Sequence, residues 1–150
     1  MRLLAPFFFC VLLSAAVACK SDPKPENAPR ALLREVGPSL VEIAPKEGQP
    51  PFCLAFTAAQ NGVVRQLTMS PENESLRCDA NRPIGDTTYR IPPAEGAVQV
   101  YVVLSDQVLD AGSVGDGLHS AVRAGRRATA MDLRAPGQVL LERLEYSPTR

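Results

Sequence analysis

The chain has 150 residues, with 16 Lys and Arg against 16 Asp and Glu, so its formal net charge is zero. This length accommodates one folded domain and hardly two. A neutral chain without Trp has neither a strong field for nucleic acid nor a rich supply of aromatic rings for stacking on bases, so we expect no nucleic-acid partner.

The first 18 residues have the order of a secretory signal peptide. Met1 and Arg2 form a short positive region, an unbroken apolar run (LLAPFFFCVLL) covers residues 3–13, and small residues dominate positions 14–18. The apolar run is shorter than the about 20 residues that a transmembrane helix needs. We therefore predict that residues 1–18 are removed on export, which leaves 15 basic and 16 acidic residues and a formal charge of −1.

The end of this segment, Ala16-Val17-Ala18-Cys19, resembles the lipobox of bacterial lipoproteins. In that family a small residue precedes a cysteine that receives a diacylglycerol thioether, so the resemblance implies lipidation of Cys19 and a membrane anchor. The family favours Leu where Ala16 stands, and Ala-Val-Ala also fits the ordinary signal peptidase. Secretion with a free thiol on Cys19 is therefore the alternative, although an exposed thiol is an oxidation liability.

The segment after Cys19 has the composition of a tether. Residues 20–30 (KSDPKPENAPR) contain three prolines and have no apolar side chain larger than alanine, so they cannot bury themselves. We predict a lipidated cysteine and flexible tether over residues 19–38, followed by a single folded domain over residues 39–150. Lys20 is not the Asp that retains some lipoproteins at the inner membrane, so the resemblance favours the outer membrane.

Four cysteines are encoded, and two of them fall in the expected domain. Cys10 is lost with the signal and Cys19 is assigned to lipid, which leaves Cys53 and Cys78 as an even pair in an oxidising compartment. Their spacing, with no CxxC, is poor for a metal site, so we predict a structural disulfide. On the chain-entropy model a loop of about 25 residues contributes about 3.5 kcal/mol.

Hydrophobic alternation and turn residues predict a mainly β domain. In residues 52–58 the pattern places Phe52, Leu54 and Phe56 on one face and the residues between them on the other. Asn61-Gly62 then predicts a hairpin with a type I′ turn. Polar residues 70–86 are expected to be a loop, which the disulfide would pin to the hairpin. The expected strands cover residues 39–44, 52–58, 63–69, 87–91, 97–104 and 138–146, with 97–104 central.

One helix is expected before the last strand. Ser113 and Asp116 fit a capping box, apolar residues follow at helical spacing, and Gly125 is a natural stop. Residues 138–146 fit a helix or a strand, and we favour a strand. The resulting fold class is α+β, mainly β: a small antiparallel sheet or sandwich of five to six strands with one helix between the last two.

Motifs for catalysis, metal binding or a cofactor are not found in the sequence. His119 is the single histidine, and no nucleophile elbow or phosphate loop accompanies it. A basic run near the helix end could bind an acidic partner or lipid head groups, although solvation of a surface and pairing with the helix C-terminus explain it as simply. This run contains Arg123, Arg126, Arg127 and Arg134.

These features favour a non-enzymatic binding or interaction domain, held in the bacterial envelope by lipid, with an envelope protein or small ligand as partner. An envelope hydrolase that uses His119 and a purely structural lipoprotein are the alternatives. We expect the protein at the outer membrane, facing the periplasm or the surface. A soluble periplasmic or secreted protein is the alternative location.

Overall fold

The computed structural model describes residues 28–149. Within this range the chain forms two antiparallel sheets, with one α-helix between β7 and β8. The strands are β1 (Ala31–Gly37), β2 (Leu40–Pro45), β3 (Phe52–Ala59), β4 (Val64–Gln66), β5 (Leu76–Arg77), β6 (Tyr89–Arg90), β7 (Val98–Ser105) and β8 (Val139–Tyr146). The helices are α1 (Ala111–Arg123) and the 3₁₀ turns η1 (Ile84–Asp86), η2 (Pro93–Glu95) and η3 (Ala130–Leu133). The predicted mainly β class is confirmed.

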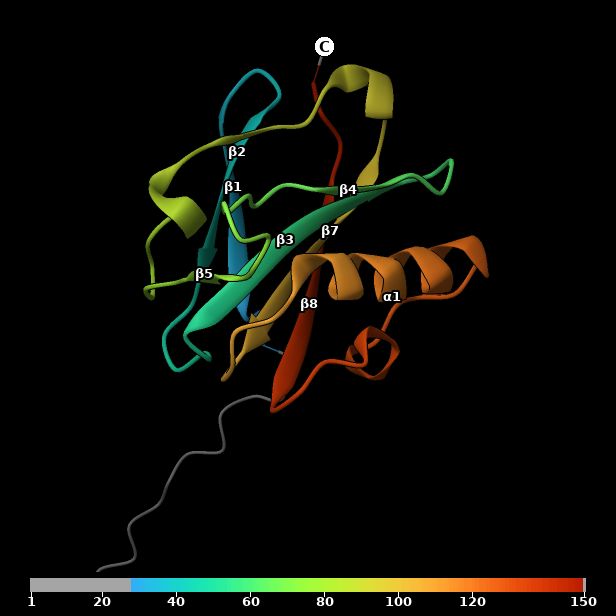
Figure 1. The fold of residues 1–150 in the computed structure, drawn as a ribbon. Helices are drawn as coiled ribbons and strands as arrows, with labels where there is room; N and C mark the ends of the chain where they lie inside the picture. The colour runs from blue at the N-terminus through green and yellow to red at the C-terminus, as the bar shows by residue number, and fades with distance from the viewer. Residues whose placement is uncertain (1–27, 150) are drawn as a thin grey trace, which may run out of the picture.

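The larger sheet is the middle of three layers. Its strand order is β4-β3-β7-β8, with β5 paired to the far end of β3, and the smaller sheet has the order β1-β2-β6. Figure 1 shows α1 on one side of the larger sheet and β1 and β2 on the other. The predicted central position of the strand around residues 97–104 is confirmed, because β7 pairs with β3 and β8.

Alternation along β3 supplies two separate apolar cores. Leu54 and Phe56 pack toward α1, with Leu118 of the helix. Cys53 and Ala55 pack toward the smaller sheet, with Ile43 of β2. The two faces predicted for residues 52–58 are therefore confirmed, and both are buried. β7 is apolar for the same reason, because both of its faces are buried as well.

The hairpin after β3 is confirmed, but its predicted turn type is wrong. Only Gly62 in this turn has a positive φ, of 85°, whereas a type I′ turn needs two such residues. Gly62 N donates to Ala59 O at 2.9 Å, and Ala59 N donates to Val63 O at 2.9 Å, so three residues form the loop.

The returning strand is also shorter than the predicted 63–69. Leu67 N and Thr68 N both donate to Ala55 O, at 2.8 and 3.4 Å, so two residues oppose one and the ladder ends. Thr68 Oγ1 accepts a hydrogen bond from Ala55 N at 3.1 Å. This side-chain acceptor replaces the backbone carbonyl that a continued strand would have offered to the Ala55 amide.

The folded domain begins earlier than the predicted residue 39. Ala31–Gly37, assigned to the tether from sequence, is strand β1, paired antiparallel with β2. Arg34 lies opposite Glu42 and forms an ion pair with it. The tether composition described for residues 20–30 does not continue into this strand, whose first residue, Ala31, is fully buried.

The predicted loop over residues 70–86 contains two short elements. β5 pairs with β3 at Phe52 and Cys53, and η1 follows it. Cys53 and Cys78 form the predicted disulfide, with their Cα atoms 6.1 Å apart, so this segment is pinned to β3. The strand predicted over residues 87–91 shortens to β6, where burial raises the pKa of Tyr89 to about 12.

The helix and the final strand form, although the predicted N-cap is wrong. α1 begins at Ala111, so Asp110 is the N-cap and its carboxylate accepts a hydrogen bond from Ser113 N at 2.7 Å. This hydrogen bond lowers the pKa of Asp110. Residues Val139–Tyr146 form a strand as favoured, pairing with β7 along its whole length.

Gly117 provides the close contact between α1 and η3. A Cβ atom at this position would lie 2.5 Å from Asp132 O and 3.0 Å from Leu133 Cα, both on the backbone. At Gly115 the nearest atom, Phe56 Cε1, would be 3.4 Å away, which is an ordinary contact. Glycine at position 117 lowers the helix propensity of α1, but it permits α1 to pack against η3.

We predict opposite effects for alanine at these two positions. Alanine gains about 1 kcal/mol of helix propensity at either site, but at Gly117 the overpacking costs about 1–3 kcal/mol. Gly117→Ala should lower the urea midpoint, while Gly115→Ala leaves it unchanged or raises it. Equal stabilisation by both substitutions would contradict the close approach of α1 to η3.

Candidate binding pocket

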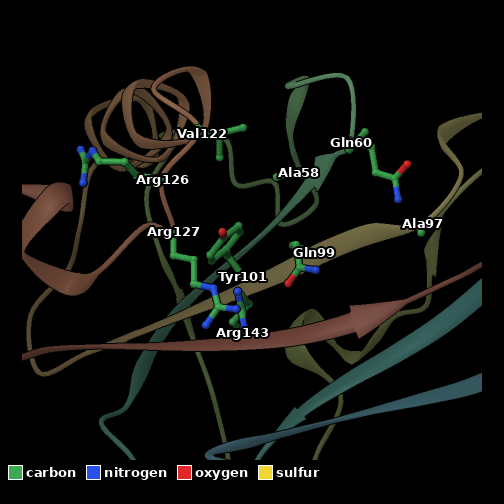
Figure 2. A pocket seen from close by; sticks show the side chains of 11 residues that line it. Ala58, Gln60, Ala97, Gln99, Tyr101, Val122, Arg126, Arg127 and Arg143 are labelled. Atoms are coloured by element: carbon green, nitrogen blue, oxygen red, sulfur yellow. The ribbon is translucent and has the colours of Figure 1, made fainter.

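The helix covers only part of its side of the larger sheet, and a hollow lies where it ends. The pocket has a volume of about 260 Å³ and receives residues from β3, β7, β8 and the end of α1. Figure 2 shows this pocket from close by. Its lining consists of Ala58, Ala59, Gln60, Ala97, Gln99, Tyr101, Val122, Gly125, Arg126, Arg127 and Arg143.

Strand register assembles the floor of the pocket. On β7, Gln99 lies opposite Ala58 of β3, and Tyr101 lies opposite Arg143 of β8. Residues two apart on a strand share a face, so these side chains all face the helix layer. Because Ala58 is small and α1 ends nearby, this part of the sheet stays open.

Tyr101 places a polar atom in this floor. The residue is only 3% exposed, because its ring packs in the core beneath α1. Its hydroxyl forms no hydrogen bond with another of residues 28–149, and Figure 2 shows it directed toward the helix end. The neighbouring Gln99 side chain donates to Glu145 Oε1 at 3.4 Å. Tyr101 therefore offers a free donor at the base of the pocket.

The end of α1 turns the chain across the pocket. Gly125 has a φ of 67° and donates its N–H to Val122 O at 2.9 Å, and Arg126 N donates to Ala121 O at 3.1 Å. This pair of bonds is a Schellman motif, which satisfies the last carbonyls of the helix. The predicted stop at Gly125 is confirmed, and it places two arginines directly after the turn.

Asp132 pairs with the first of these arginines and turns its side chain away from the other arginines of the pocket. Its carboxylate accepts hydrogen bonds from Thr129 N and Oγ1, both at 2.8 Å, and pairs with Arg126 at 3.1 Å. The Thr129 hydrogen bonds, with a smaller contribution from Arg126, lower the pKa of Asp132. Figure 2 shows Arg126 pointing away from the other two arginines.

Arg127 and Arg143 are the cations directed into the pocket. In Figure 2 the Arg127 side chain extends from the segment after α1 toward Tyr101 and Arg143. None of the ion pairs within 4 Å among residues 28–149 includes Arg127 or Arg143. The pocket thus combines two uncompensated guanidinium groups with one phenol donor.

The structure separates most of the residues that the sequence singled out. Cys53 and Cys78 come together, whereas Cys19 lies outside the described residues. His119 lies on α1 beside a hollow of about 600 Å³ lined by Val63 and Arg123, and it makes no hydrogen bond with another of residues 28–149.

The predicted basic run also divides. Arg123 borders the His119 hollow, Arg134 lines a third hollow beside η3, and only Arg126 and Arg127 line the pocket at the helix end. The sequence analysis missed Tyr101, Gln99 and Arg143. Arg143 carried a detectable signal, because it interrupts the face formed by Val139 and Leu141 in the last strand.

Within residues 28–149 no group of three His, Cys, Asp or Glu side chains could hold a metal ion, and the sole α-helix, of 13 residues, is too short to cross a membrane. No protein-family model, curated protein or solved structure matches the chain.

Proposed function

We propose that this chain is a lipid-anchored protein of the bacterial envelope whose domain binds an envelope ligand without transforming it. The pocket at the end of α1 is the observation that carries the proposal. It joins an apolar part, formed by Ala58, Ala59 and Val122, to a few convergent polar groups, which is the usual construction of a ligand site. The lipobox-like Ala16–Cys19 segment and the prolines after it support an anchor with a short tether.

Binding suits the geometry better than hydrolysis does. A histidine that acts as a general base needs a nucleophile within hydrogen-bond reach and a group that orients the ring. Among the described residues His119 has neither, and it lies outside the pocket at the helix end. The pocket instead presents two cations, the Tyr101 hydroxyl and Gln99 Oε1, which is unpaired within residues 28–149, and all of these are recognition groups. We therefore place the ligand there and assign no reaction to the domain.

The anchor is tested by the intact mass of protein extracted from membranes with detergent. We expect a chain that begins at Cys19, carries diacylglycerol, and lacks two hydrogens because of the Cys53–Cys78 bond. A chain that begins at Cys19 without lipid would support secretion and contradict the anchor. A chain that begins at Met1 would contradict export itself. Cys19→Ala is the control and should abolish the lipid mass.

Binding is tested by NMR on the isotope-labelled mature chain in micelles, titrated with fractions of envelope extract. We expect amide shifts grouped at Ala58, Gln99 and Arg127, with no chemical change in the bound compound. Ala97→Trp should remove them, because it adds bulk at an exposed position that lines the pocket. Ala80→Trp, exposed in the segment before η1, is the matched control. Shifts that spare the pocket, or that persist in Ala97→Trp, would contradict the proposal.

A further inference from the structure

We propose that the pocket at the end of α1 binds an oxyanion group, a carboxylate or a phosphate, between Arg127 and Arg143, with the Tyr101 hydroxyl as a third donor. The inference rests on the proposed binding function and adds the chemical class of the ligand. Both arginines line the same hollow, and the tyrosine forms part of its floor. Planar guanidinium groups match the geometry of both oxyanions.

The acidic side chains around the pocket have partners other than Arg127 and Arg143. Asp132 accepts hydrogen bonds from Thr129 and pairs with Arg126. Glu145 accepts from Gln99, which itself lines the pocket. Glu142 lies opposite Val102, on the face of β8 turned away from the pocket, and accepts from the Arg30 backbone N–H at 2.9 Å. No carboxylate of residues 28–149 lies within 4 Å of Arg127 or Arg143, so both guanidinium groups are free to pair with a bound anion.

Arg143 gives the stronger argument for an anionic ligand, because it is less exposed than Arg127. It is half-buried on the helix-facing side of β8, directly opposite Tyr101. A cation withdrawn from water without a partner loses hydration that only a counter-charge restores. An anion in the pocket supplies that charge, so the position of Arg143 is favourable when the pocket is filled.

The helix end opposes the anion only weakly. A helix C-terminus carries about half a negative charge, which would repel an anionic ligand. Here the carbonyls of Ala121 and Val122 accept hydrogen bonds from Arg126 and Gly125, and two whole positive charges face the same space. The attraction of an anion to the two guanidinium groups therefore exceeds its repulsion by the helix end.

Size limits the ligand to a small group. A volume of about 260 Å³ lies below the usual range for a drug-sized ligand, which begins near about 300 Å³. Ala58, Ala59 and Val122 form the apolar part of the lining. The preferred ligand therefore carries one oxyanion beside a small apolar group, either as a free molecule or at the end of a longer one.

The test is isothermal titration of the mature full-length chain in micelles with two probes, inorganic phosphate and N-acetylalanine. At least one probe should give saturable binding, and the tighter one identifies phosphate or carboxylate as the source. Arg127→Gln and Arg143→Gln should each weaken it by about tenfold to a hundredfold, as expected for loss of a charge-assisted hydrogen bond. Tyr101→Phe keeps the buried ring and should weaken binding several-fold.

Arg77→Gln is the matched control, because Arg77 is an exposed arginine on β5, which pairs with the opposite end of β3. It should bind as the unaltered chain does. Absence of saturable binding by both probes would overturn the oxyanion assignment, and so would equal weakening in Arg77→Gln. If only this assignment fails, envelope fractions still shift the pocket amides in the NMR titration, so the two failures are distinguishable.

Discussion

Burial of β3 and β7 on both faces is the constraint on which the rest of the fold depends. These strands form the centre of the middle layer, and nearly every residue along them is buried. A sheet buried on both sides needs a cover on each side, which β1 and β2 provide on one face and α1 on the other. The disulfide from Cys53 holds the segment around β5 to the same strand.

The pocket follows from the unequal lengths of the sheet and its cover. α1 ends at Arg123, before it reaches the row of the sheet that contains Gln99. Polar side chains can occupy this row because the helix does not seal it. The Schellman turn at Gly125 then carries Arg127 over the opening, and Asp132 fixes Arg126 beside it. The position of the pocket is therefore determined by the point at which α1 ends.

Local pattern predicted the central strands, because alternation and apolar runs report directly on burial. It predicted the Cys53–Cys78 bond from compartment and parity, and the structure contains it. It failed at β1, because the tether predicted from the polar residues 20–30 was extended to residue 38, over a segment that pairs with β2. It also failed to find the pocket, since Tyr101 and Arg143 are 42 positions apart and meet only through strand register.

Side-chain NMR of the arginine Nε–Hε groups tests the central claim, that Arg127 and Arg143 act together at the end of α1, most directly. As phosphate or N-acetylalanine is added, the signals of Arg127 and Arg143 should move along one saturating curve, while that of Arg126, paired with Asp132, stays in place. Parallel, non-saturating movement of all arginine signals would show general ionic screening and would contradict a built site in this pocket.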